Sequence, residues 1–132
     1  MQLICMALLF FSPDVCQYQP YDDLPLMVTA YNPMQGGINC DSDCNVFGTG
    51  IEVTPEHFGT AAACPTEWVK LDRTAVITIH GNDYRCVDNF GSVENRYPVY
   101  RNGDWYLRVD LVLEEPDLWG VQIIDGWSMR WE

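Results

Sequence analysis

The sequence has little positive charge. Lys and Arg number 7 and His 2, against 19 Asp and Glu, so the formal net charge is −12 over 132 residues. Such a surface repels the phosphates of nucleic acids and of anionic lipids. We therefore expect neither a nucleic acid nor a membrane as a partner of the mature protein. A neutral or cationic partner, such as a glycan, suits this charge better.

Long helical patterns are also missing, because no segment keeps an apolar period of 3.6 residues over three turns. Short runs rich in β-branched and aromatic residues stand between turn signals instead. The clearest run, residues 105–113, alternates apolar and polar side chains, which is typical of a strand with one buried face. Apolar residues make up 48% of the chain, enough for a core, and short strands between turns predict a small all-β barrel or sandwich.

The predicted strands are residues 26–31, 60–63, 75–79, 84–87, 105–113, 121–124 and 127–131. We expect the last two to form a hairpin around Asp125-Gly126, and residues 81–83 to form another hairpin turn. Single helical turns are expected at Glu56 and at residues 114–118.

The N-terminal segment has no run long enough to cross a bilayer. Residues 3–11 are apolar, which is too short for a spanning helix but matches the apolar part of a secretion signal. However, no Lys or Arg precedes this run and no small-residue cleavage site follows it. The prolines of residues 12–25 indicate a linker. We therefore divide the chain into a segment 1–25 and a domain 26–132, and expect a retained segment to pack against the barrel or against another protein.

Pairs of metal ligands are scarce. Six cysteines are present, but only Cys40 and Cys44 are close in sequence and the two histidines stand alone, whereas zinc sites usually have two tight pairs. Disulfides in an extracytoplasmic compartment therefore explain the cysteines better than zinc does. The pairing of four of them stays open: Cys5, Cys16, Cys40 and Cys44.

Residues 39–45 place oxygen-bearing side chains at every second position, as calcium loops do. The sixth position is Cys44 instead of Gly, and the twelfth is Gly50 instead of Glu. We expect no metal and no cofactor, with this loop closed by a Cys40–Cys44 bridge or by Asx turns.

Five short motifs occur in a fixed order between residues 27 and 124. They are Thr29-Ala30-Tyr31, Thr49-Gly50 with Val53-Thr54-Pro55, residues 59–65 (GTAAACP), residues 84–91 (YRCVDNFG) and residues 108–111 (RVDL), followed by Trp119-Gly120. In these motifs and their order the chain resembles the 3D (three-aspartate) domains of peptidoglycan-cleaving lytic transglycosylases.

The resemblance implies a six-stranded double-psi β-barrel that cleaves the glycan strand of peptidoglycan without a cofactor. It assigns Asp110 as the catalytic acid and then base, and Asp88 as the neighbouring carboxylate that keeps Asp110 protonated. The sugar's own 6-hydroxyl then attacks, which gives a 1,6-anhydro product. Further substrate contacts are expected from the motifs and from one loop predicted to be exposed: Tyr31, Thr49, Trp68, Asn89 and Arg108.

Two positions depart from the family. Cys64 stands where the family has its first aspartate, and Phe90 interrupts the glycine-rich turn after Asp88. In the resembled fold Cys64 and Cys86 end strands beside the site, so we expect a disulfide between them, with two free buried thiols as the alternative. The departures leave a second function open, a non-catalytic module that binds cell-wall glycan or belongs to a larger assembly such as a phage tail. The first function implies a cell-envelope or secreted location, and the phage assembly implies a virion.

Overall fold

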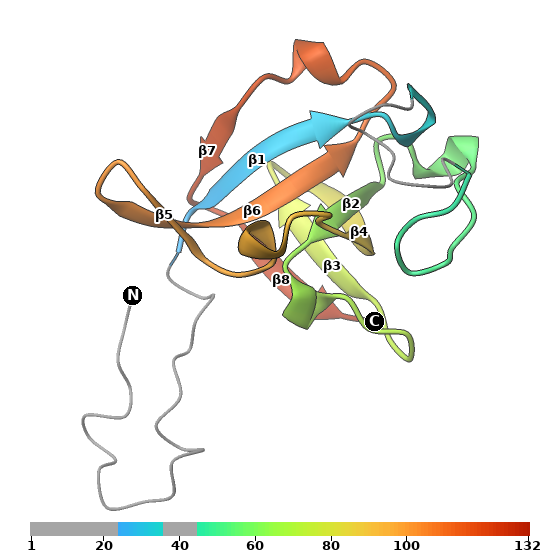
Figure 1. Ribbon diagram of the computed structural model, residues 1–132, viewed down its shortest axis with the longest axis horizontal. Helices are drawn as coiled ribbons and strands as arrows, with labels where there is room; N and C mark the ends of the chain where they lie inside the picture. Colours follow the sequence, from blue (N-terminus) through green and yellow to red (C-terminus); the bar gives the residue numbers. More distant parts are fainter. Residues whose placement is uncertain (1–23, 36–44) are drawn as a thin grey trace, which may run out of the picture.

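The computed structural model describes residues 24–35 and 45–132, in which strands and short 3-10 turns are the regular elements (Figure 1). The strands are β1 (Leu26–Tyr31), β2 (Ala61–Cys64), β3 (Ala75–Ile79), β4 (Asn82–Asn89), β5 (Val99–Arg101), β6 (Asp104–Val112), β7 (Gln122–Ile124) and β8 (Ser128–Trp131). The 3-10 turns are η3 (Pro33–Gln35), η5 (Pro55–His57), η6 (Thr66–Trp68), η7 (Val93–Arg96) and η8 (Pro116–Leu118). The all-β prediction is confirmed, and η5 and η8 are the two expected helical turns.

Several predictions concern residues 1–23 and 36–44, which lie outside the described residues. They are the N-terminal segment and linker, the four cysteines at positions 5, 16, 40 and 44, and most of the calcium-like loop. Within the described part of the chain, no helix is long and apolar enough to cross a membrane.

The strands form one sheet in the order β7-β1-β6-β2-β4-β3-β8, and β5 pairs with β6 beside this path. Two neighbouring pairs are parallel, β1 with β6 and β2 with β4, whereas the other pairs are antiparallel. Near the middle of the order, β6 and β2 pair with each other in antiparallel fashion. The other neighbour of each is parallel: β1 beside β6 and β4 beside β2.

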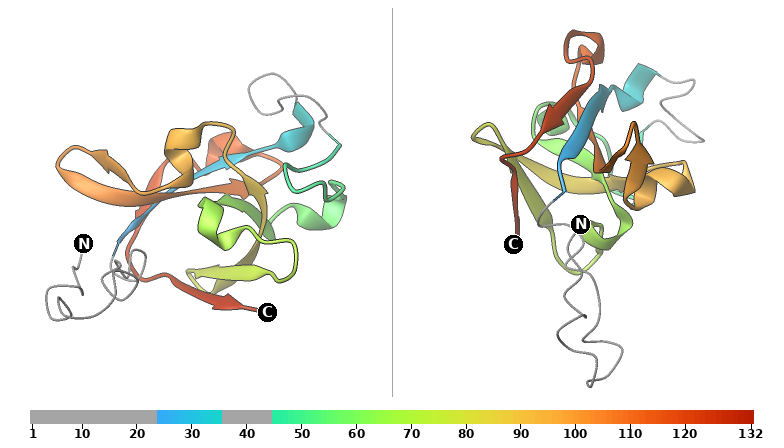
Figure 2. Two further views of the ribbon diagram at one scale, coloured as in Figure 1. Left: turned by 60° about the horizontal axis from the view of Figure 1, so that its bottom comes forward. Right: turned by 90° about the vertical axis from the view of Figure 1, so that its left-hand side faces the viewer.

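The sheet curls because its two end strands are consecutive in the chain. β7 ends at Ile124 and β8 begins at Ser128, and four Cα steps span at most about 15 Å. Seven strands in a flat sheet would separate β7 from β8 by about 29 Å. The ends must therefore approach, and Figure 2 shows the resulting half-barrel. The predicted hairpin of the last two strands is wrong, since β7 pairs with β1 and β8 pairs with β3.

Two hydrophobic clusters cover the two faces of the sheet. The larger cluster fills the inside of the curl and takes alternate residues of β6, namely Leu107, Val109 and Leu111, as their spacing predicted. Each fully buried Leu or Val contributes roughly 1.5–3 kcal/mol to folding. The smaller cluster lies on the opposite face, which we call the outer face: Tyr31, Phe47, Ala61, Ala63, Val87, Phe90 and Val112.

Two hairpins turn tightly through residues with positive φ. β3 and β4 connect through His80 and Gly81, with φ of 52° and 80°, and Ile79 pairs with Asn82. Positive φ at both central residues is the signature of a type I′ turn, so this turn begins earlier than the expected 81–83. Asn102 and Gly103 make the same kind of turn between β5 and β6.

Candidate active site

Two carboxyl groups lie on either side of one small residue on the outer face. Ala63 in the middle of the sheet pairs with Asp88 of β4 on one side and with Asp110 of β6 on the other. Their Cα atoms are therefore two strand spacings apart, about 10 Å. Because directly paired residues project to the same side of a sheet, the two carboxyl groups face each other across the Ala63 methyl group.

A β-bulge directs Asp88 to this face. Ala62 pairs with Cys86 but Ala63 pairs with Asp88, so Val87 is an extra residue in β4. Regular alternation would turn Asp88 to the same side as Cys86, which belongs to the inner core. The bulge places both Val87 and Asp88 on the outer face, a known use of bulges next to functional sites.

Three donors hold the Asp88 carboxylate. The Tyr31 hydroxyl donates to Oδ2 at 2.6 Å, and the backbone N–H groups of Gly48 and Asn89 donate to Oδ1 at 2.6 and 3.0 Å. A Cβ atom at position 48 would lie 2.8 Å from Oδ1, so only glycine allows this approach. Asp88 is thus fixed as an acceptor.

The buried phenol of Tyr31 stays protonated. Burial raises its pKa, and the negative charge of Asp88 together with the hydrogen bond to it raises the pKa further. Tyr31 therefore acts as a permanent donor to Asp88. Thr49 pins the same loop to β4, because its hydroxyl donates to the Val87 carbonyl at 2.6 Å.

Asp110 has a different environment. Burial raises its pKa from 3.8 to about 6, and the nearby charge of Asp88 acts in the same direction. A hydrogen bond from the Thr29 hydroxyl to Oδ1 (3.0 Å) and the charge of Arg108 oppose that rise. Asp110 is therefore the carboxyl of this pair that can carry a proton close to neutral pH, as a general acid requires.

Arg108 lies two residues before Asp110 on the same face of β6 and spans the space between β1 and η7. Its guanidinium donates to Thr29 Oγ1 at 3.1 Å and to Asn95 Oδ1 at 3.4 Å. Its Nε is buried without an acceptor, and its side chain lies over the Phe90 ring with 5.6 Å between Cζ and the ring centroid. Thr29 thus connects Arg108 to Asp110.

One expected substrate contact is wrong. Trp68 is only 3% exposed, because η6 turns it inward against Trp127 at a centroid distance of 5.3 Å. Its ring therefore belongs to the core and offers no face to a sugar. The other expected contacts lie around the two aspartates, although Tyr31 is buried and only the backbone N–H of Asn89 donates to Asp88.

The expected disulfide is present. The Cα atoms of Cys64 and Cys86 are 5.6 Å apart and their sulfur atoms are bonded. Both side chains belong to the inner core, on the opposite side of the sheet from the aspartates. A carboxyl group at position 64 would therefore enter the core, and the position between Asp88 and Asp110 is that of Ala63.

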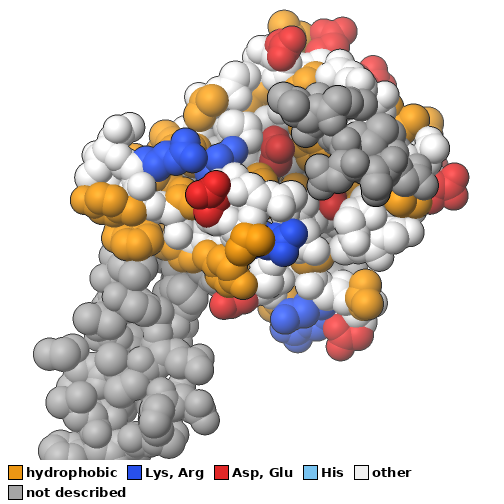
Figure 3. All heavy atoms as spheres, viewed as in Figure 1, with side chains coloured by type: hydrophobic (Ala, Val, Ile, Leu, Met, Phe, Trp, Pro, Cys, Tyr) orange, Lys and Arg blue, Asp and Glu red, His pale blue; other side chains and the backbone are white. Residues whose placement is uncertain are grey.

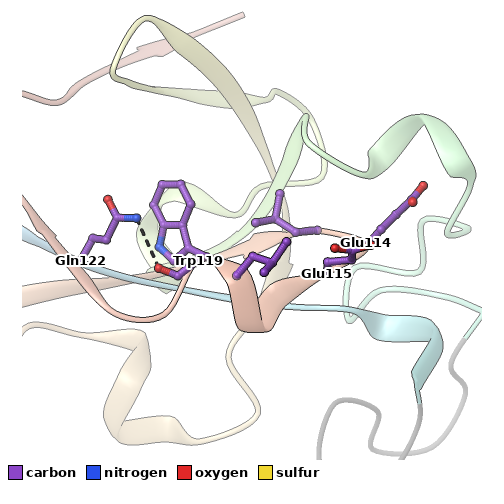
Figure 4. Close-up of a pocket in the computed structure, with 6 residues that line it drawn as sticks. Glu114, Glu115, Trp119 and Gln122 are labelled. Atoms are coloured by element: carbon purple, nitrogen blue, oxygen red, sulfur yellow. Dashed lines mark hydrogen bonds between the residues drawn. The ribbon is translucent and has the colours of Figure 1, made fainter.

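A pocket of about 420 Å³, shown in Figure 4, is lined by neither Asp88 nor Asp110. Its lining comes from the end of β6, η8 and the start of β7: Leu113, Glu114, Glu115, Leu118, Trp119 and Gln122. Trp119 is held there by a hydrogen bond from its Nε1 to the Val28 carbonyl at 3.0 Å. Across the described residues, no group of three or more His, Cys, Asp or Glu side chains is arranged to hold a metal. We take the pair of Asp88 and Asp110, rather than this pocket, as the candidate site because the pair has groups that can transfer a proton.

Comparison with known proteins adds no assignment, because no family model, curated protein or solved structure matches the chain.

Sequence reasoning missed three residues that shape the site. Gly48 donates to Asp88, Thr29 links Arg108 with Asp110, and Asn95 accepts from Arg108. Thr29 is polar and follows the core residue Val28 in β1, where Leu26 is also buried. Strand alternation could therefore have placed the Thr29 side chain on the outer face from the sequence. The roles of Gly48 and Asn95 depend on contacts between distant segments, for which the sequence has no local signal.

Proposed function

We propose that this protein cleaves the glycan strand of peptidoglycan in the manner of a lytic transglycosylase, with Asp110 as its acid and base. The observation that carries this proposal is the raised pKa of Asp110, about 6, beside the fixed carboxylate of Asp88. Carboxyl groups with perturbed pKa values cluster at functional sites, and a carboxyl pair with different environments is the arrangement that glycoside cleavage uses.

The proposed reaction uses one carboxyl group twice. Protonated Asp110 donates its proton to the glycosidic oxygen, and the bond from this oxygen to the anomeric carbon breaks. The resulting Asp110 carboxylate takes the proton of the sugar's own 6-hydroxyl, whose oxygen bonds to the anomeric carbon. The product is a 1,6-anhydro sugar, and Asp110 is protonated again for the next cycle.

The hydrogen bonds of the pair support this division of roles. Among the described residues, Oδ1 of Asp110 accepts from Thr29 while Oδ2 has no partner and is the oxygen proposed to exchange the proton. Both oxygens of Asp88 already accept hydrogen bonds, so its role is electrostatic. Its negative charge stabilises positive charge that develops at the anomeric carbon.

The strand pattern favours the double-psi barrel as the finer description of the fold. The order β7-β1-β6-β2-β4-β3 is symmetric about its centre, with a parallel pair and then an antiparallel pair on each side. In this interpretation β5 and β8 are additions to a six-stranded core. The disulfide agrees with an oxidising, extracytoplasmic location, and we propose the cell envelope or the secreted fraction.

A non-catalytic module is the second candidate, and two observations favour it. Ala63, not a third carboxylate, lies between the two aspartates, and Phe90 is buried where the resembled family has a flexible turn. Such a module would bind cell-wall glycan, alone or as a structural part of a larger assembly such as a phage tail.

Digestion of purified peptidoglycan separates the two functions. A transglycosylase releases muropeptides with 1,6-anhydro ends, which mass spectrometry identifies by the loss of one water relative to hydrolysis. The expected result is release by the wild-type protein and about 10²–10⁴-fold less by Asp110→Asn, with Asp83→Asn as the matched control. Binding to insoluble peptidoglycan without release of soluble fragments would establish the non-catalytic module instead.

A further inference from the structure

β7 has one edge that no strand of the described chain covers. It stands at the end of the strand order and pairs with β1 only, so the backbone groups on its other side have no partner strand. The pairing of β1 with β6 shows which groups these are. Leu107 N–H donates to the Pro25 carbonyl at 3.0 Å, so Pro25 and every second residue after it direct their backbone groups toward β6. The residues between them, Leu26 and Val28, direct theirs toward β7.

The backbone groups at the free edge are those of Ile123. Two pairs flank this residue: Leu26 with Ile124, and Val28 with Gln122. Both are hydrogen-bonded pairs, and in an antiparallel ladder such pairs alternate with pairs that share no hydrogen bond. The N–H and C=O of Ile123 therefore point away from β1 and out of the sheet. They are available to an added strand.

Large apolar side chains are exposed along the segment that leads into this edge. They are Leu118, Val121 and Ile123, with exposed fractions of 82%, 66% and 48%. The pocket of about 420 Å³ opens beside them, with Leu118 in its lining and Gln122 of β7 at one end (Figure 4). This volume is within the range of pockets that bind ligands. A free strand edge beside a pocket is typical of sites that bind an added strand, because the edge pairs with its backbone and the pocket takes a side chain.

The charges around the edge are all negative. Glu114 and Glu115 line the pocket, and Asp117 and Asp125 are exposed nearby in the sequence. None of these four forms an ion pair with a described residue, and neither residues 109–129 nor β1 contain Lys, Arg or His. Figure 3 shows Asp and Glu side chains together with hydrophobic ones at the top of the view, where η8 lies in Figure 1. Charge complementarity therefore favours a partner with positive charge.

We propose that the free edge of β7 binds an extended segment of another protein that is rich in basic and apolar residues. The segment pairs with the backbone of Ile123 and covers the apolar side chains of Leu118 and Val121. One of its Lys or Arg side chains enters the pocket and meets Glu114 and Glu115. This docking surface goes beyond the proposed function and uses neither of the two aspartates of the candidate site.

The charge of the chain argues against its own residues as the occupant. A second copy that paired β7 with β7 would bring two identical acidic surfaces together, and like charges across a strand pair are destabilising. Residues 1–23 contain three Asp and no Lys, Arg or His, so they offer no positive charge to the pocket. A basic segment of a different protein fits both the free edge and its charge.

The test is an NMR titration of the full-length chain with three capped six-residue peptides. The first alternates Lys and Val, the second alternates Glu and Val, and the third is the Lys–Val peptide with its central amides methylated. We expect the first to shift the backbone amides of residues 113–124 and to bind about tenfold more tightly than either of the others. The Glu peptide is repelled by the acidic surface, and the methylated peptide has lost the N–H groups that pair with the edge. Equal affinities, or no saturable shift in this segment, would overturn the docking surface.

Variants locate the binding. Ile123→Pro removes the outward N–H and leaves the hydrogen bonds to β1, since proline is tolerated where the N–H of an edge strand faces solvent. Glu114→Gln combined with Glu115→Gln removes the two charges of the pocket. Each change is expected to weaken binding of the Lys–Val peptide roughly three- to tenfold. The matched control combines Glu56→Gln with Glu67→Gln, two exposed glutamates elsewhere, and should bind like wild type. Unchanged affinity in both the proline and the pocket variants contradicts the proposal, and the pocket variant alone decides if the proline variant does not fold.

Hydrogen exchange at the Ile123 amide separates the possible occupants. The proposal predicts fast exchange in the chain alone and protection when the Lys–Val peptide is added. Protection that grows with protein concentration would assign the edge to a second copy. Protection at every concentration would assign it to the chain's own residues, and either result overturns the proposal. The titration measures this edge and the peptidoglycan assay measures the aspartate pair, so failure of one proposal is distinguishable from failure of the other.

Discussion

The β3–β8 edge of the sheet and its centre differ in how their charges are paired. At the β3–β8 end, Arg85 and Arg130 pair with Glu132 and Asp83 at 2.9 and 3.0 Å, and these side chains are well exposed. On the outer face around β5 and β6, by contrast, Arg101 and Arg108 form no ion pair with any described residue, although the charge of Arg108 acts on Asp110. The edge thus has paired, exposed charges, whereas the centre has two arginines beside a buried carboxyl group with a raised pKa.

Asp83 and Asp110 express the same difference through their pKa values. A hydrogen bond from Arg130, supported by one from Thr78, lowers the pKa of Asp83. Burial raises the pKa of Asp110 to about 6. Hydrogen bonds therefore favour the ionised form of Asp83, whereas the loss of solvation on burial favours the protonated form of Asp110.

The largest expected effect comes from removing the proton donor. Asp110→Asn keeps the size of the side chain and can still accept from Thr29, but it cannot donate a proton to the glycosidic oxygen. We expect release of anhydro-muropeptides to fall about 10²–10⁴-fold, whereas Asp83→Asn should leave the rate unchanged. Equal rates in wild type and Asp110→Asn would remove Asp110 from the mechanism.

The second effect is the pH dependence of folding stability, which has opposite signs for Asp110 and Asp83. The folded pKa of Asp110 is raised, so the folded state binds its proton more tightly and loses stability as pH rises between about 4 and 6. Asp110→Asn should therefore be more stable than wild type at pH 7, by up to roughly 2–3 kcal/mol, with the gain vanishing below about pH 4. For Asp83 the pKa is lowered, so its small contribution is lost as pH falls.

Urea unfolding at a series of pH values measures both trends. A gain for Asp110→Asn that grows toward acid pH would show that the sign of the Asp110 shift is wrong.

The third effect concerns the loop that holds Asp88. Gly48→Ala places a Cβ atom 2.8 Å from the Asp88 carboxylate, so the carboxylate or the loop must shift, which weakens the hydrogen bond from the Gly48 N–H. We expect a loss of about 1–2 kcal/mol in stability together with slower cleavage. Gly126→Ala is the matched control, since nothing lies within 4 Å of the added Cβ atom and φ is not positive there. Comparable losses in the two variants would mean that the Gly48 contact has no special role.

The smallest effect is expected at the paired edge. Arg130→Gln removes the ion pair with Asp83 and the contact with Glu132, but all three groups are solvent-exposed and screened by salt. Its midpoint of thermal unfolding should match that of wild type within experimental error, and its cleavage rate should be unchanged. A clear loss of activity would show that the β3–β8 edge is coupled to the aspartate pair at the centre of the sheet.

Much of the strand content was predictable from the sequence because local pattern and burial agree. β1 and β3 have their expected bounds, and β6 alternates because every second residue enters the core. β5 was missed although Asn102-Gly103 is a strong hairpin signal. The prediction of a final hairpin was wrong because β7 and β8 lie at opposite edges of the sheet, and its curl lets a three-residue connection join them. No local sequence pattern encodes that curl.

The site was less predictable than the fold. The resemblance pointed to Asp88 and Asp110, and β2 aligns both with Ala63. The bulge at Val87, which directs Asp88 outward, is set by pairing with a distant strand and cannot be read from β4 alone. Trp68 was misplaced because a tryptophan in an irregular segment can enter the core as easily as face solvent.

The most direct test is the pH profile of cleavage by the wild-type protein on purified peptidoglycan, with anhydro-muropeptides as the product measured. Because the acid form of Asp110 is required, the rate should be high below pH 6 and fall as pH rises through about 6, tenfold for each further pH unit. Asp110→Asn should stay about 10²–10⁴-fold below the wild-type maximum and show no such fall through this range. A rate that rises through this range, or no anhydro product from wild type at any pH, would contradict the account of the outer face as a catalytic surface.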